Sequence, residues 1–226
     1  MLAILAYSLS GKMFASFETR KYEFPFVYTV YYYPYTVIAY GTRLNLGYYF
    51  GEGFGLYVAL GTGYGRNTFT IVDKYEGSYY TSYTRLETIS TLFPAEAGLG
   101  LSFVPFRGDR GLFRVSPEFR FMYLSDKEYL KDSTVEHYTD PYDTTIVSVT
   151  DTTYLIKATE ISLPISLGGE YFITDKVSLR LDYGFYLLSI GSTTMTQEGS
   201  PDTVTNRSLN ILKPADKFRF GATFYF

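Results

Sequence analysis

The sequence predicts an all-β fold, in which eight antiparallel strands form an up-and-down barrel that spans a membrane. Three observations lead to this prediction. Aromatic residues make up 19% of the chain, and aromatic side chains favour strands over helices. Eight segments show alternation of side-chain character with a period of two, which is the pattern of extended chain. The connections between these segments are long and short in turn along the whole chain.

The predicted strands occupy residues 2–16, 36–50, 54–71, 84–106, 112–124, 154–172, 177–190 and 212–226. Tight turns are expected at 51–53, at 107–111 and in the segment ITDK at 173–176. Long loops are expected at 17–35, 72–83, 125–153 and 191–211. A membrane barrel with an even number of strands has its short turns and both termini at one end and its long loops at the other. We therefore expect a single domain that covers residues 1–226.

The two faces of the predicted strands carry different kinds of residue. In VSLRLDYGFYLL, large apolar side chains alternate with Ser178, Arg180 and Asp182. The polar face of other strands is rich in small residues such as Gly98 and Gly100. Glycine weakens an exposed strand, whereas the crowded interior of a small barrel needs small residues beside large ones. We therefore expect the polar face inside the barrel and the apolar face against lipid.

Two prolines are predicted to interrupt the pairing of strands. Pro94 and Pro164 fall on the inward face, each four residues before an inward glycine. Proline has no N–H to donate to a neighbouring strand, so it is confined to edges, strand ends and bulges. A bulge or a local break in pairing at these positions helps a sheet to curl.

Charged residues are expected to fill the lumen. Those on the inward face that we expect to form an ion network are Arg43, Glu96, Arg114, Glu118, Arg120, Glu160, Glu170, Arg180, Asp182 and Arg219. An eight-stranded barrel is just wide enough for side chains to fill it, and buried charges must be paired. The network should therefore neutralise itself and plug the lumen. The alternative is a narrow gated pore.

Composition excludes several functions. The formal charge of −3 provides no basic field for nucleic acid. The absence of cysteine excludes disulfides and the common zinc sites that use cysteine. No run of eighteen apolar residues predicts a membrane helix. Neither a cofactor nor a metal site is expected.

The last strand, KFRFGATFYF, carries four phenylalanines on its apolar face: Phe218, Phe220, Phe224 and Phe226. With four hairpins, alternating short and long connections and this aromatic end, the whole chain resembles the small bacterial outer-membrane β-barrels of the OmpA/OmpX-like type. The resemblance implies a bacterial outer-membrane location, contact with outer-membrane lipid and lipopolysaccharide, and recognition of the last strand by the barrel-assembly machinery. The opening MLAILAYSLSGKMF lacks the basic region and cleavage site of a secretory signal peptide.

Two of the expected loops have an unusual composition, and the first of them is a candidate for contact with partners. The first is rich in tyrosine, which favours the membrane interface and provides rigid contact area at small entropic cost. Its candidate contact residues are Tyr22, Phe24, Phe26, Tyr28, Tyr31, Tyr32 and Tyr33. The loop at 125–153 is acidic, but its spacing does not match an EF-hand, so we interpret it as a solvated acidic loop.

Three functions follow from these expectations, in order of preference. The first is a non-enzymatic structural or interaction protein that docks another envelope protein or surface. The second is a narrow passive pore for ions or small solutes. The third is a lipid-modifying enzyme built on Ser133, His137 and Asp140, although their spacing does not bring a base to a nucleophile. We therefore expect no enzyme activity.

Overall fold

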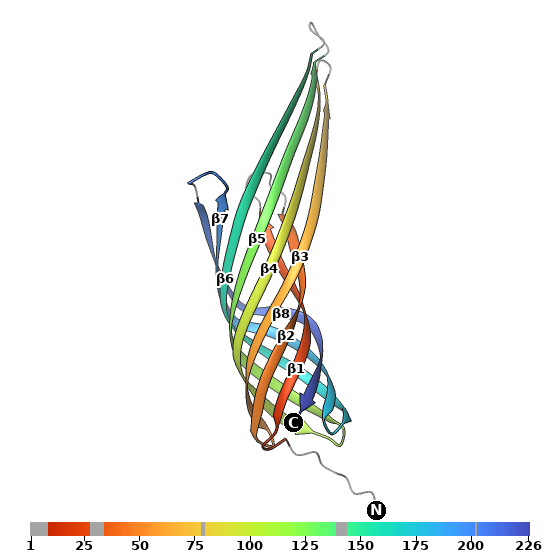
Figure 1. Cartoon of the computed structure of the whole chain (residues 1–226), viewed down its shortest axis with the longest axis vertical. Coiled ribbons are helices and arrows are strands. Elements are labelled where there is room, and N and C mark those ends of the chain that lie inside the picture. The colour runs from red at the N-terminus through yellow and green to blue at the C-terminus, as the bar shows by residue number, and fades with distance from the viewer. Residues whose placement is uncertain (1–8, 28–33, 78–79, 139–143, 202) are drawn as a thin grey trace, which may run out of the picture.

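Eight antiparallel strands form a closed barrel in the computed structural model of the chain, which confirms the predicted fold class (Figure 1). The structure describes residues 9–27, 34–77, 80–138, 144–201 and 203–226, except for the side chains of 23–27, 34–37 and 213–217. The strands are β1 (Met13–Val27), β2 (Pro34–Gly51), β3 (Phe54–Glu76), β4 (Tyr80–Arg107), β5 (Gly111–Tyr138), β6 (Thr144–Thr174), β7 (Val177–Gln197) and β8 (Thr203–Tyr225). No helix in this part of the chain is long and apolar enough to cross a membrane.

Three tight turns join the strands at one end of the barrel, as the sequence predicts. They connect β2 to β3, β4 to β5 and β6 to β7. The start of β1 and the end of the chain lie at the same end, where the Phe226 N–H donates to the Met13 carbonyl oxygen at 2.9 Å (Figure 1). The up-and-down topology of the prediction is therefore confirmed.

The strands at the opposite end are much longer than predicted. Most described residues in the four expected loops, 17–35, 72–83, 125–153 and 191–211, belong to strands instead. β6 has 31 residues, whereas a tilted strand needs only about ten to cross a bilayer. These ranges are rich in Thr, Val and Tyr, which favour strands, and each lies beside a strand with which it can pair. Strand pairing therefore continues beyond the lipid.

The first strand begins later in the chain than the sequence predicts. A turn precedes it, in which Gly11 has a φ of 73° and the Lys12 N–H donates to the Leu9 carbonyl oxygen at 3.1 Å. Two charged residues, Glu18 and Arg20, fall within the loop that the sequence predicts at 17–35. They lie in β1 and point into the lumen, where other charges neutralise them.

The two inward prolines interrupt strand pairing, as predicted. Opposite Pro94, the pairing of β3 with β4 is missing over a short stretch. At Pro164, the pairing of β6 with β7 slips by one residue. Both irregularities are expected where a ladder lacks an N–H donor.

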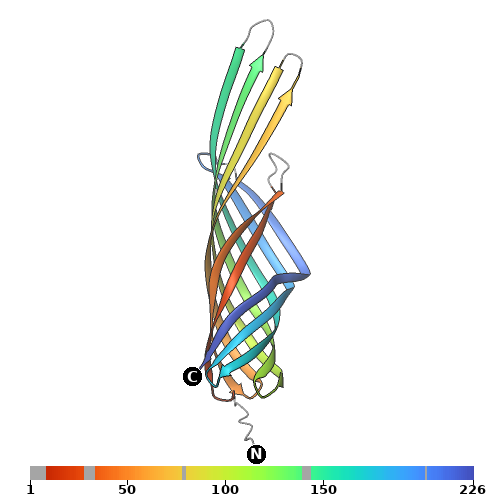
Figure 2. The ribbon, with the colours of Figure 1, turned by 90° about the vertical axis from the view of Figure 1, so that its right-hand side faces the viewer.

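Four strands continue far beyond the barrel as a single sheet (Figure 2). We call this part, at 66–76, 80–91, 127–138 and 144–155, the projecting sheet. Its strands pair in register up to Glu76–Thr81 between β3 and β4 and Tyr138–Thr144 between β5 and β6. The sheet stands well above the hairpin of β7 and β8 and has free edges on β3 and β6.

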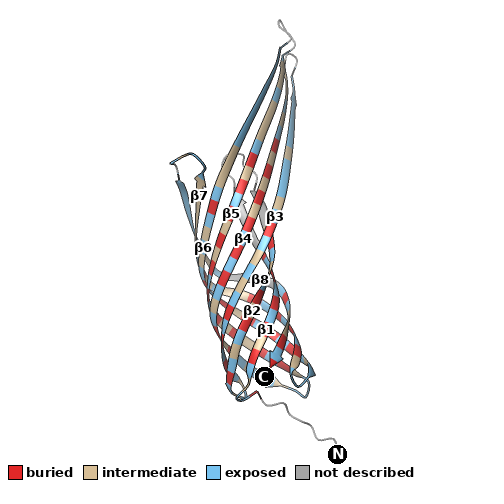
Figure 3. Cartoon of the chain, in the orientation of Figure 1, coloured by how far each residue is buried: buried red, intermediate tan, exposed pale blue. Residues whose placement is uncertain are grey.

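Buried and exposed residues alternate along the strands of the barrel, as Figure 3 shows. Charged and small polar side chains are buried, and large apolar side chains are exposed. The barrel is closed by the shortest of its pairings, in which β1 and β8 pair only from Phe14–Tyr225 to Glu18–Gly221. We call this pairing the closing seam.

Candidate functional site: the filled lumen and the projecting sheet

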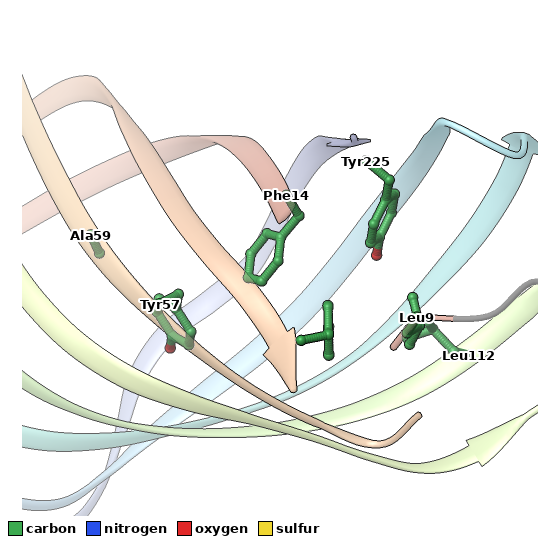
Figure 4. Close-up of a cluster of buried hydrophobic side chains, with 7 residues drawn as sticks. Leu9, Phe14, Tyr57, Ala59, Leu112 and Tyr225 are labelled. Atoms are coloured by element: carbon green, nitrogen blue, oxygen red, sulfur yellow. The ribbon is translucent and has the colours of Figure 1, made fainter. Parts of the chain in front are cut away.

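An apolar cluster fills the lumen at the short-turn end (Figure 4). The members of this lower apolar cluster are Leu9, Phe14, Tyr49, Tyr57, Ala59, Leu112 and Tyr225. The rings of Phe14 and Tyr49 lie 5.2 Å apart between centroids. Two hydroxyls point up to carboxylates, since Tyr57 donates to Glu118 at 3.0 Å and Tyr225 donates to Glu170 at 2.6 Å. The cluster therefore closes this end with tyrosines whose polar atoms are satisfied.

Above the lower apolar cluster lies a buried network of charges. Its arginines are Arg20, Arg43, Arg114, Arg120, Arg180 and Arg219, and its carboxylates are Glu18, Glu96, Glu118, Glu170 and Asp182. We call this set the ion network. Ions removed from water need opposite charges and hydrogen bonds to offset their lost hydration. Each member of the ion network lies within 4.0 Å of at least one opposite charge.

Glu96 on β4 is one centre of the ion network. Its carboxylate lies 3.3 Å from Arg20 Nε, 3.5 Å from Arg120 Nη1 and 3.8 Å from Arg43 Nη1. Arg43 also pairs with Glu118, and the Arg120 guanidinium lies 5.1 Å from the centre of the Tyr186 ring. These contacts connect the strands on both sides of the lumen.

Glu18 on β1 is the second centre. Its carboxylate lies 2.8 Å from Arg180 Nη1, 3.5 Å from Arg219 Nη1 and 3.9 Å from Arg20 Nη2. Asn45 on β2 donates to the same carboxylate at 2.7 Å. Because Glu18 joins arginines of β7 and β8 to β1, it supports the closing seam from inside.

The structure brings together every expected member of the ion network except Glu160. Glu160 is half-buried and forms no ion pair with the described residues. Glu18 and Arg20 were missed, because the strand that carries them was assigned to a loop. The signal was present in the sequence, since Phe14, Ser16, Glu18, Arg20 and Tyr22 keep a period of two and all point inward.

A second apolar cluster covers the ion network from above. This upper apolar cluster consists of Tyr22, Ala39, Leu92, Met122 and Leu124. The expectation that Tyr22 lies in an exposed contact loop is wrong, because its ring is buried here. Of the other expected contact residues, Phe24 and Phe26 lie in β1 with undescribed side chains, and Tyr28, Tyr31, Tyr32 and Tyr33 lie outside the described residues. The charges are thus enclosed between two apolar clusters.

Glycines on the inward face make space for the ion network, as the excess of small residues predicts. A Cβ atom at Gly61 would lie 2.6 Å from the Glu96 side chain, and one at Gly98 would lie 2.5 Å from the Glu118 carboxylate. A Cβ atom at Gly168 would overlap the Asp182 carboxylate. The described residues form no group of three acidic or histidine side chains that could hold a metal ion.

Large apolar side chains cover the outside of the barrel on all eight strands. Examples are Phe17, Phe50, Leu60, Phe93, Phe119, Ile173, Leu179 and Phe220. The four phenylalanines of the last strand also point outward. The band ends in aromatic residues such as Tyr64 and Phe93, above which Arg66 and Lys127 point outward. Proteins in water do not expose a continuous apolar belt of this extent, whereas a barrel in lipid does.

The chain is a small transmembrane β-barrel. No protein-family model and no curated protein sequence matches it. Among solved structures it is similar to Ail, the attachment invasion locus protein of Yersinia pestis, with 11% identity over 96% of this chain and 99% of that chain and a TM-score of 0.37. It is also similar to a major outer membrane protein from Thermus thermophilus, with 15% identity over 95% of this chain and 99% of that chain and a TM-score of 0.36.

Above the barrel, the two faces of the projecting sheet differ in charge. The outer face carries both signs, since Glu76, Glu87 and Asp151 lie there beside the cations. The face continuous with the lumen carries the carboxylates Asp73, Glu128, Asp132 and Glu136. No lysine or arginine lies on this inner face at the positions that the structure describes. The cations of the sheet all lie on its outer face: Arg66, Lys74, Arg85, Lys127 and Lys131.

The residues of the enzyme hypothesis do not form a catalytic group in the described structure. Ser133 and His137 lie on the outer face of β5, four residues apart. The Ser133 hydroxyl donates to the Arg85 carbonyl oxygen at 3.2 Å, and His137 Nδ1 lies 3.1 Å from the Thr145 hydroxyl. Asp140 lies outside the described residues.

Proposed function

We propose that this barrel is a non-enzymatic protein of the bacterial outer membrane that docks another envelope protein or surface through its projecting sheet. The observation that carries the proposal is the sheet itself, whose four strands extend far beyond the apolar band and whose cations all lie on one face. Lipid anchoring does not need these residues. A rigid charged sheet held above the membrane is suited to binding a partner.

The filled lumen supports this role over that of a pore. Water and ions would have to pass both apolar clusters and the ion network between them. Opening such a path would separate buried ion pairs, and an unpaired buried charge is strongly destabilising. A channel function therefore requires a rearrangement of the lumen, whereas docking requires none.

The test compares the full barrel with a trimmed barrel. In the trimmed barrel, 71–86 and 132–150 are each replaced by Asn-Gly, which joins the paired residues Thr70–Glu87 and Lys131–Asp151 through a two-residue hairpin turn. Both tagged proteins are isolated from native membranes in mild detergent, and bound proteins are identified by mass. We expect a stoichiometric companion with the full barrel that is lost from the trimmed barrel.

Recovery of the full barrel alone would overturn the docking proposal. A gel that compares heated and unheated samples shows whether the trimmed barrel has kept its fold, since a folded barrel keeps a compact mobility in detergent until it is heated. Conductance in a planar bilayer examines the pore alternative. Reproducible channels that change on substitution of Arg114 or Arg180 would favour the pore.

A further inference from the structure

Three tyrosines form a row at the far end of the inner face of the projecting sheet. Tyr75, Tyr80 and Tyr138 come from β3, β4 and β5. The ring centroids of Tyr75 and Tyr80 are 5.9 Å apart, and those of Tyr80 and Tyr138 are 5.0 Å apart. Tyr75 is 62% exposed and Tyr138 is 37% exposed. The row therefore presents aromatic surface to a partner.

One carboxylate is held at this row by the tyrosine hydroxyls. Tyr80 donates to Glu136 Oε1 at 2.9 Å, and Tyr138 donates to Glu136 Oε2 at 3.2 Å. Each carboxylate oxygen thus has one tyrosine donor and a free lone pair. We call Tyr75, Tyr80, Tyr138 and Glu136 the tip cluster.

The negative charge of Glu136 has no counter-ion in the described structure. No described lysine or arginine forms an ion pair with it. The nearest basic residue in the neighbouring part of β3, Lys74, points to the outer face and pairs with Glu76. The undescribed residues beside the tip cluster, 78–79 and 139–143, contain no lysine or arginine either. The tip cluster therefore combines an uncompensated carboxylate with exposed ring faces.

These two features attract the same kind of group. A lysine or arginine side chain is drawn to the electron-rich face of a tyrosine, and arginine can also bind a carboxylate through two hydrogen bonds. Holding Glu136 in place reduces the entropy lost on binding. An anionic or purely apolar group would gain neither contact.

The inner face below the tip cluster also favours basic groups. Asp132, which is half-buried, lies four residues before Glu136 on the same face of β5. Glu128, four residues further down the strand, is fully buried and is not open to a partner. Carboxylates at this spacing on a strand stand about 13 Å apart. An extended polypeptide with a basic residue at every fourth position has the same spacing along its length.

We propose that the inner face of the projecting sheet binds a basic, extended polypeptide, and that the tip cluster receives one of its lysine or arginine side chains. This inference rests on the proposed docking function and specifies the chemistry of the partner. The outer face is the less favourable binding face, because it carries five cations against the three carboxylates Glu76, Glu87 and Asp151.

The probe is a fluorescent peptide of repeated Lys-Ser-Thr-Ser, with a Glu-Ser-Thr-Ser peptide as its counterpart. Binding to the full-length barrel is measured in zwitterionic micelles by fluorescence anisotropy. We expect the lysine peptide to bind and the glutamate peptide not to bind. Glu136→Gln and Tyr75→Leu should each raise its Kd by roughly fivefold, since each removes one of the two attractions.

The matched control is Glu76→Gln, which removes the same charge at the same end of the sheet but on the outer face. It should leave the Kd unchanged. Equal weakening by Glu76→Gln and Glu136→Gln would overturn the proposal in favour of a general effect of net charge. Failure of the lysine peptide to bind the native barrel would also overturn it.

The two proposals can fail separately. If Glu136→Gln and Tyr75→Leu retain a native companion that the trimmed barrel loses, docking stands and the tip cluster is not its site. If the peptide binds as expected but the full barrel is recovered alone from native membranes, the tip cluster is supported as a cation site. The proposed docking function is then contradicted. The heated and unheated gel confirms the fold of each variant.

Discussion

Arg114 Nη1 lies 3.0 Å from Glu170 Oε1, and the exposed fractions of the two side chains are 2% and 0%. The pair joins the neighbouring strands β5 and β6 in the lower part of the lumen. Glu170 also accepts hydrogen bonds from Ser178 at 2.8 Å and from Tyr225 at 2.6 Å. This carboxylate therefore connects the ion network to the lower apolar cluster.

Glu170→Gln should destabilise the barrel strongly. The substitution removes the nearer of the two carboxylates that pair with Arg114 and leaves Asp182, 3.4 Å from Nη2, as the other. Loss of one partner from a buried pair costs about 3–5 kcal/mol, which is the upper end of the expected loss. The measurement is the free energy of unfolding by urea in lipid vesicles. Glu76→Gln, at an exposed ion pair with Lys74, is the control and should change little. Equal effects would show that the buried pair does not stabilise the fold.

Gly168→Ala should destabilise the barrel, whereas Gly169→Ala should not. A methyl group at Gly168 would overlap the Asp182 carboxylate and lie 2.9 Å from the Leu181 carbonyl oxygen. The nearest atom to a methyl group at Gly169 is the Leu112 carbonyl oxygen at 3.8 Å. Overpacking at Gly168 should cost about 1–3 kcal/mol in the same unfolding assay. Similar values for the two variants would contradict the crowded lumen.

Stability should depend on pH through Asp126, which lies above the apolar band at the base of the projecting sheet. Burial raises the pKa of Asp126 from 3.8 to about 6, although the Ser90 hydroxyl and the Thr91 N–H hydrogen-bond to the carboxylate and act in the opposite direction. The folded state therefore holds the proton more tightly than the unfolded state. The stabilisation from this group is complete below about pH 4 and is lost as the pH rises through 6.

Asp126→Asn should remove this dependence. Between pH 4 and pH 8 the native barrel should lose on the order of 2 kcal/mol more stability than the variant. Urea unfolding of both proteins at the two pH values measures the difference, in which the effects of all other carboxylates cancel. Parallel pH profiles for the two proteins would refute the assignment.

Phe226→Ser should reduce assembly in cells more than stability. The side chain is 73% exposed at the end of the apolar band, and its backbone N–H keeps the bond to Met13 whatever the side chain. From the resemblance to small outer-membrane barrels, we propose that the barrel-assembly machinery reads this aromatic residue of the last strand during insertion. We expect a several-fold lower yield of heat-modifiable barrel in membranes. Phe218→Ser, on the same face of β8, is the control, and an equal loss would remove any special role of Phe226.

Much of the fold follows from the sequence, because the alternation of side chains directly reflects the two faces of a barrel wall. The strand count, the tight turns and the inward direction of residues such as Arg180 and Asp182 were predictable on this basis. The ends of the strands were not predictable, because alternation shows neither where the lipid ends nor how far strand pairing continues beyond it. The segment at 144–153 was assigned to a loop although its run of Thr and Val favours a strand.

The partners within the lumen could not be predicted from alternation. The period of two shows that Glu96 and Arg120 point inward, but the stagger of neighbouring strands decides which charges meet. Glu18 could not be placed among these charges for a different reason, because it lies at 17–35, where the sequence predicts a loop. The tip cluster depends on the pairing of β3, β4 and β5 far from the membrane, which no local pattern records.

The closing seam makes the backbone pairing around the barrel unequal in length. β5 and β6 share backbone pairing along almost their whole length, from Gly111–Tyr171 to Tyr138–Thr144, whereas β1 and β8 meet over five residue pairs. Local opening begins where the fewest backbone hydrogen bonds must break. We therefore expect the amide hydrogens that join β1 to β8 to become accessible to exchange before those of the longer pairings. Glu18 on β1 pairs with Arg180 on β7 and Arg219 on β8, and these ion pairs hold the closing seam together from inside the lumen.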